Sequence, residues 1–147
     1  MEYKAIAIAN AFIEQANNGR INNLTPMKLQ KLMFFAQSWY LKHTGMPLFE
    51  GSFERWQYGP VLPEIYHEFK RFGSSNIDNF GYDMWKNRQT IDYYDSEVIN
   101  FLDQIISIYG IYSGTELSWM THQLGTAWSN GTLGTIINSN DMINGKV

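Results

Sequence analysis

The sequence predicts an all-α fold: a mainly helical single domain of five or six helices over residues 1–147, with at most a small β-hairpin. Apolar residues recur at three- and four-residue spacing in five segments, which is the period of an amphipathic helix. Helix-start and helix-stop residues flank most of these segments. The 147 residues are 44% hydrophobic and 17% charged, so the chain is globular and can bury about two-thirds of the surface that it exposes when unfolded.

The first two helices are expected before residue 45. Residues 3–17 carry one apolar stripe at helical spacing. The second helix begins more clearly, because Thr25 can accept an amide hydrogen bond as its N-cap and Pro26 fits the first helical position. It is expected to cover residues 26–43 and to stop at Gly45, which suits a left-handed C-cap. Since apolar residues cover most of its circumference, we expect this helix at the centre of the core.

A short extended segment, a turn and a third helix are expected next. Residues 53–58 favour an extended conformation, and Gly59-Pro60 is expected to form the turn, because a residue before proline avoids the helical region. Pro63 then begins a helix that ends at Gly73. The buried stripe of this helix is expected to consist of Leu62, Ile65, Tyr66 and Phe69.

The clearest amphipathic helix lies in the second half of the chain. Residues 74–90 are polar with interspersed aromatics and are expected to form a long loop or a small irregular element. In residues 96–109 the apolar side chains keep the helical period for three turns, and Gly110 ends the segment.

The last two helices are shorter. Ser113 and Glu116 match a capping box, which predicts a helix beginning at this point. In that helix Trp119 points away from the stripe Leu117–Met120–Leu124, so we expect its side chain to be exposed. The tail is rich in Gly and Asn and offers one short helix near Asp141–Ile143, with Ser139 or Asn140 as its N-cap.

Composition excludes several classes of protein. The chain has no cysteine, which rules out disulfides and thiolate metal sites. A net charge of −3 does not favour nucleic acid as a partner, because such proteins usually carry a basic face. No apolar run approaches the ~20 residues of a membrane span, and the N-terminus lacks the pattern of a signal peptide. We therefore expect a cytoplasmic protein that does not bind a membrane.

The three histidines are too few and too scattered in the sequence to predict a metal site. Glu64, His67 and Glu68 share one helical face, but a zinc site needs a completed tetrahedral set, and His43 and His122 lie far away in the sequence. We therefore expect no metal and no cofactor, with His67 on a solvated face. His122 ends a helix beside a threonine, where it can hydrogen-bond free carbonyl groups, so a structural role is favoured.

No catalytic motif stands out, so the sequence does not predict an enzyme. The nucleophile elbow G-x-S-x-G and both glycine-rich phosphate-binding motifs are absent. A DNA-binding role would rest on Lys28, Lys31, Lys70 and Arg71, and the neighbouring glutamates would repel phosphate. A DNA-binding regulator, a phage accessory protein and, less favoured, a small-molecule enzyme are the alternatives to the function given below.

Two stretches carry a resemblance to a known family: "KLQKLMFFAQSWYLKHTGMPLFEGSFERWQYGPVLPEIYHEFKRFG" and "YSGTELSWMTHQLGTAW". With the patterns K-L-Q-K-L, W-x-Y-G-P-V and L-S-x-x-T-H, the chain resembles the Panacea domain over roughly residues 3–143. This family is also described as SocA-like antitoxins or phage-associated GepA-like proteins.

The resemblance implies an antitoxin of a bacterial or phage toxin–antitoxin system, which neutralises a co-encoded toxin by direct protein contact. For one branch of the family it also implies an adaptor role, in which the antitoxin delivers its toxin to a AAA+ protease. From the residues themselves we expect the toxin-binding anchors to be Trp56, Tyr58, Trp119 and His122, because aromatic side chains on rigid supports supply much of the energy of protein interfaces.

Overall fold

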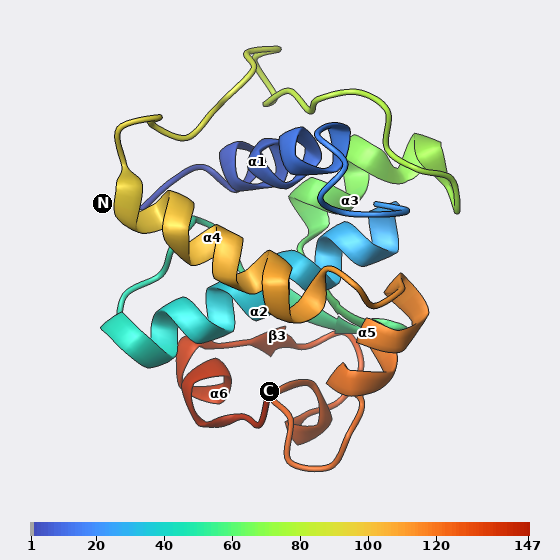
Figure 1. Cartoon of the computed structure of the whole chain (residues 1–147). Helices are drawn as coiled ribbons and strands as arrows, with labels where there is room; N and C mark the ends of the chain where they lie inside the picture. The colour runs from blue at the N-terminus through green and yellow to red at the C-terminus, as the bar shows by residue number, and fades with distance from the viewer. Residues whose placement is uncertain (1) are drawn as a thin grey trace.

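The computed structural model describes residues 2–147 and shows a helix-dominated, mixed fold with a small antiparallel sheet (Figure 1). In chain order the elements are α1 (Ala5–Asn17), α2 (Pro26–Thr44), β1 (Phe53–Trp56), β2 (Gly59–Val61), α3 (Pro63–Phe69), the 3-10 helix η1 (Lys70–Phe72), α4 (Ser96–Tyr109), α5 (Gly114–Thr121), the 3-10 helix η2 (Trp128–Asn130), β3 (Ile136–Ile137) and α6 (Ser139–Asn144). The helix-rich character was predicted correctly. A strictly all-α fold was not, because three strands form a sheet.

Helix α2 runs through the middle of the molecule, as expected for a helix with apolar residues all round. Every residue from Lys28 to Ser38 is buried, and α2 packs against the other five helices and against β2 (Figure 1). Thr25 caps its first turn, with its hydroxyl accepting the Lys28 amide at 3.2 Å, and Gly45 ends it at a φ of 74°. The ring of Phe35 stacks on that of Tyr109 in α4, with 4.2 Å between their centroids.

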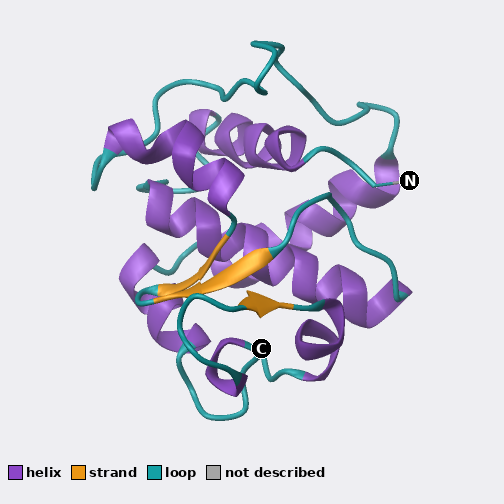
Figure 2. Ribbon diagram, turned by 180° about the vertical axis from the view of Figure 1, so that it is seen from behind, coloured by secondary structure: helices purple, strands orange, loops and turns teal. Residues whose placement is uncertain are grey.

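The sheet has the strand order β2-β1-β3, and both pairs are antiparallel (Figure 2). In the β1–β2 hairpin Trp56 pairs with Gly59, so the turn residues are Gln57 and Tyr58. The expectation that Gly59-Pro60 forms the turn was therefore wrong, since both residues belong to β2. Proline is tolerated in β2 because that strand lies at the edge of the sheet and needs no amide on its outer side.

Several helix ends differ slightly from the sequence-based expectations. Helix α3 stops at Phe69 and continues as η1 before Gly73. The N-cap of α6 is Asn138, which precedes the two expected candidates, and its side chain accepts the Asp141 amide at 2.8 Å. Tyr66 was expected in the buried stripe of α3 but is 39% exposed.

The segment from residue 73 to residue 95 has no helix or strand, as expected for the polar stretch 74–90. In Figure 1 it passes over α1, on the side away from the sheet. The buried amide of Asn10 holds it there, because Asn10 Nδ2 donates to the carbonyls of Gly81 and Gln89 and Asn10 Oδ1 accepts the Gly81 amide. Within residues 2–147, no helix combines the length and apolar character that a bilayer crossing requires.

Candidate functional site

The turn of the β1–β2 hairpin is clamped from one side by the C-terminal third of the chain. Three successive carbonyl groups, at the end of β1 and in the turn, each have a side-chain partner: the Trp56 carbonyl accepts from Trp128 Nε1 at 2.8 Å, the Gln57 carbonyl lies 2.8 Å from His122 Nε2, and the Tyr58 carbonyl accepts from Ser118 Oγ at 2.6 Å. Short loops without such partners are usually mobile. These three bonds instead give the turn a fixed position against α5.

His122 lies at the centre of this clamp. Its Nδ1 is 2.6 Å from the carbonyl oxygen of Ser118 in the last turn of α5, and its Nε2 faces the Gln57 carbonyl. Both neighbours are acceptors, so a neutral imidazole can donate to only one of them, whereas the imidazolium can donate to both. The ring also packs 3.9 Å from that of Trp128. The contact with the Ser118 carbonyl matches the structural role that was favoured for His122.

Gly59 and Pro60 lie directly over a buried lysine of α2. A side chain at Gly59 would place its Cβ 2.7 Å from Lys31 Cε and 2.8 Å from Thr121 Oγ1, and the φ of Gly59 is +116°. Only glycine suits this position, for reasons of both space and backbone conformation. Lys31 is 1% exposed, and its ammonium donates to the Pro60 carbonyl at 3.2 Å. Burial lowers the pKa of Lys31 to about 7.

An apolar groove of about 420 Å³ opens beside this lysine, between the start of α2, the hairpin turn and α3. Its walls are mainly Met27, Trp56, Tyr58, Ile65, Tyr66 and Phe69. The rings of Trp56 and Tyr66 meet edge to face at 4.9 Å, and Trp56 Nε1 donates to Glu54 Oε1 at 2.9 Å. Among the described residues that line the groove, Lys31 is the only charged one.

Of the four residues expected to anchor the toxin, two are exposed and two are half-buried. Tyr58 and Trp119 project into solvent, with 63% and 66% of their surfaces exposed. Trp56 and His122 are half-buried and help to hold the turn. The expected orientation of α5 is only partly right, since Leu117 is buried but Leu124, beyond the helix end, is 92% exposed.

Ser113 and His67, which the sequence also singled out, neither line the groove nor belong to the clamp. Ser113 begins α5 in a capping box, in which its hydroxyl accepts the Glu116 amide at 3.1 Å and Glu116 Oε1 accepts the Ser113 amide at 2.9 Å. His67 is exposed on α3. Within residues 2–147 no three His, Asp or Glu side chains gather as a metal site would require.

Two of the four basic residues on which a DNA-binding role would rest are inaccessible to phosphate. Lys28 and Lys31 are both buried, whereas Lys70 and Arg71 are exposed. Lys28 Nζ donates to the carbonyls of Asn22 and Gly110, each at 2.7 Å. The sequence did not reveal this burial, because lysines on a helix normally indicate its solvated side.

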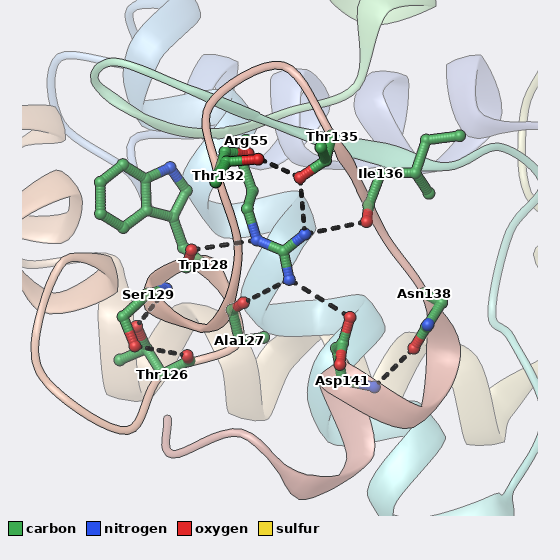
Figure 3. Close-up of polar contacts among 10 residues, drawn as sticks. All are labelled: Arg55, Thr126, Ala127, Trp128, Ser129, Thr132, Thr135, Ile136, Asn138 and Asp141. Atoms are coloured by element: carbon green, nitrogen blue, oxygen red, sulfur yellow. Dashed lines mark hydrogen bonds and ion pairs between the residues drawn. The ribbon is translucent and has the colours of Figure 1, made fainter.

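Sequence reasoning also missed Arg55, which organises the C-terminal segment next to the clamp (Figure 3). Arg55 is 4% exposed. Its guanidinium donates to five acceptors: the carbonyls of Trp128, Ala127 and Ile136, the Thr135 hydroxyl and Asp141 Oδ2. One signal was available, since Phe53 and Arg55 are two residues apart in a strand and must share a face.

Comparison with known proteins identifies what the chain resembles. The family model described as "Antitoxin SocA-like, Panacea domain" matches residues 29–129. "Antitoxin SocA" of Caulobacter vibrioides (strain NA1000 / CB15N) is 30% identical over 128 residues, which cover 84% of this chain and 68% of that protein. No solved structure matches the chain. The matched region contains α3, α4, α5, both strands of the hairpin and most of α2.

Proposed function

The chain belongs to the family of SocA-like antitoxins with a Panacea domain, and from this premise we propose that it neutralises a co-encoded toxin by binding it directly, without covalent chemistry. The binding face that we propose is the one around the clamped hairpin turn and α5. The encounter would take place in the cytoplasm, where both chains are synthesised.

The observation that carries this proposal is the pair of exposed aromatic side chains on a rigid support. Tyr58 and Trp119 lie on neighbouring segments, because Ser118, the residue before Trp119, hydrogen-bonds the Tyr58 carbonyl at 2.6 Å. Exposed Tyr and Trp are enriched among the residues that dominate binding energy. A backbone already fixed by hydrogen bonds loses little conformational entropy when a partner binds.

The proposed face extends beyond the two aromatic side chains. A typical specific interface buries about 800 Å² on each partner. The two aromatic side chains would form its centre, and the apolar groove beside Tyr58 would extend it toward α3. The half-buried Trp56 connects the two parts, since it lines the groove and its carbonyl belongs to the clamp.

Co-expression with the product of the neighbouring gene tests this proposal. We expect growth rescue and co-purification of the two proteins, and we expect the double variant Tyr58→Ala/Trp119→Ala to lose about 2 kcal/mol or more of binding energy. Trp85→Ala is the matched control, because Trp85 is 76% exposed but belongs to the segment that passes over α1. Rescue without a physical complex would refute direct binding. If Trp85→Ala weakened the complex and the double variant did not, the chosen face would be wrong.

The same complex could also deliver the toxin to a AAA+ protease, and this adaptor mode is a finer form of the proposal. It differs from simple occlusion in one measurable quantity, the lifetime of the toxin. An adaptor shortens the half-life of the toxin in cells with the protease and not in cells without it. A toxin whose half-life stays the same while its activity is lost would indicate occlusion alone.

A further inference from the structure

Lys31 differs from the other lysines that α2 holds against the core. Lys28 Nζ donates to two carbonyls at 2.7 Å, and Lys42 Nζ donates to two carbonyls at 2.6 Å. Lys31 Nζ has one acceptor, the Pro60 carbonyl, at the longer distance of 3.2 Å. An ammonium group has three N–H donors, so the most deeply buried of the three lysines has the fewest partners.

No negative charge compensates Lys31 within the described chain. The ion pairs among residues 2–147 involve Lys4, Arg20 and Arg55 instead. Burial alone accounts for the lowered pKa of Lys31, with no contribution from a neighbouring charged group. A buried cation is normally paired with an anion, because its desolvation is otherwise uncompensated.

The groove that Lys31 lines is suited to an anion with an apolar body. Its walls are aromatic and aliphatic, with Trp56 and Tyr66 on adjacent sides. Gln30, the other polar residue of α2 in the lining, is fully engaged, since its amide exchanges two hydrogen bonds with the backbone of Leu62 at 3.0 and 2.8 Å. The ammonium of Lys31 is therefore the group of α2 with spare donors at this site. One positive charge matches a carboxylate better than a doubly charged phosphate.

We propose that this groove binds a carboxylate carried by an apolar peptide segment of the toxin, with Lys31 as the counter-ion and Trp56, Tyr58 and Tyr66 as the walls around the apolar side chains. The proposal rests on the function proposed above, because the peptide comes from the toxin. The carboxylate can be the C-terminus of the toxin or an acidic side chain, and both present the same chemistry to the ammonium. Binding requires the ammonium to turn from the Pro60 carbonyl toward the groove by rotation about the terminal bonds of the side chain.

Synthetic peptides test the inference with the full chain and without the toxin. The probes are an acetylated peptide ending in three apolar residues with a free carboxylate, its C-terminal amide, and the amide with one internal glutamate. Affinities are measured by titration calorimetry at pH 6, below the Lys31 pKa of about 7, so that its side chain carries the positive charge. We expect the free acid to bind the wild-type protein at least about ten-fold more tightly than the amide, as charge-assisted hydrogen bonds in a desolvated site typically do.

Variants assign this preference to the lysine. Lys31→Met should abolish the preference for the acid, whereas Lys70→Met, which removes an exposed lysine just beyond α3, should keep it. Tyr66→Ala should weaken acid and amide by the same factor, because it removes part of a wall and no charge. This last variant tests the groove even if Lys31→Met does not fold.

The possible results separate the sources of the carboxylate and the two proposals. Equal binding of the free acid and the glutamate-containing amide indicates that a side-chain carboxylate is sufficient, and binding of the free acid alone indicates a chain terminus. Equal affinity for acid and amide, a preference that survives in Lys31→Met, or no binding of any probe at about 1 mM would overturn the inference. If the peptides fail to bind while the toxin still co-purifies, the proposed function stands and the inference fails. If the peptides bind while no toxin complex forms, the carboxylate preference of the groove stands, but the toxin as its source fails together with the proposed function.

Discussion

Replacing Lys31 with methionine should change the stability of the protein in opposite directions at pH 7 and pH 10. Burial lowers the pKa of Lys31 from 10.5 to about 7 in the folded chain, while a lysine of the unfolded chain keeps a pKa of about 10.4. Between these two values the unfolded state binds one proton more than the folded state. Stability therefore rises as the pH rises from about 7 to about 10.4, and it is lost as the pH falls back through this range.

The magnitude follows from the same pKa values. Linkage over this interval gives a gain of about 3–4 kcal/mol in the unfolding free energy of the wild type between pH 7 and pH 10, relative to a variant without the charge. Methionine keeps the apolar stem of Lys31 but leaves the Pro60 carbonyl without its partner, which costs about 1–3 kcal/mol at every pH. We expect Lys31→Met to be about 2 kcal/mol more stable than the wild type at pH 7 and about 1–2 kcal/mol less stable at pH 10.

Urea unfolding followed by tryptophan fluorescence at pH 7, 8, 9 and 10 measures this difference. Burial also lowers the pKa of Lys28 and Lys42 and raises that of Tyr109, so only the difference between variant and wild type isolates Lys31. Lys70→Met, which removes an exposed lysine just beyond α3, is the control. If the unfolding free energies of the wild type and of Lys31→Met differ by the same amount at every pH from 7 to 10, Lys31 is not a buried lysine with a lowered pKa, and this prediction is refuted.

Two further substitutions test the neighbouring contacts. Arg55→Met should destabilise the fold by about 3–5 kcal/mol, because it leaves the Asp141 carboxylate and several carbonyls without their donor. The exposed Arg88→Met loses the contact of its guanidinium with the Phe80 ring and should lower the unfolding free energy by at most about 1 kcal/mol; similar losses for the two variants would contradict the role of Arg55. Gly59→Ala should lower the melting temperature clearly more than Gly134→Ala, since both glycines have positive φ but only Gly59 would bring a Cβ within 3 Å of other side chains; equal shifts would show that backbone strain alone decides.

The sequence contained enough information for the helices because their signals are local. The stripe of α4, the Thr25-Pro26 start of α2 and the Ser113–Glu116 capping box each depend on residues a few positions apart. The sheet could not be predicted in the same way. Strand β3 has two residues, and its pairing of Ile137 with Phe53 joins segments far apart in the chain, which no local period reports.

In the candidate site, too, the features set by local sequence were predictable and those set by distant contacts were not. The exposure of Trp119 followed from helical spacing, because it lies off the side of α5 that carries the buried Leu117. The burial of Lys31 and Arg55 did not, since a pattern of polar and apolar residues assigns ionisable side chains to the surface. Their partners are mainly backbone carbonyls of distant segments. Every residue has such a carbonyl, so the sequence does not show which of them accept these hydrogen bonds.

The hairpin turn and the side chains that hydrogen-bond it are synthesised at different times. The turn ends at residue 58, but its three side-chain partners are supplied by residues 118–128. A ribosome that adds 5–20 residues per second needs roughly 4–14 s to make the intervening 70 residues. During this interval the nascent chain carries the hairpin without its clamp. If the toxin is bound through this turn, as we propose, the antitoxin can act only after residue 128 has left the ribosome, so synthesis of the 70 residues that follow the turn delays protection of the cell.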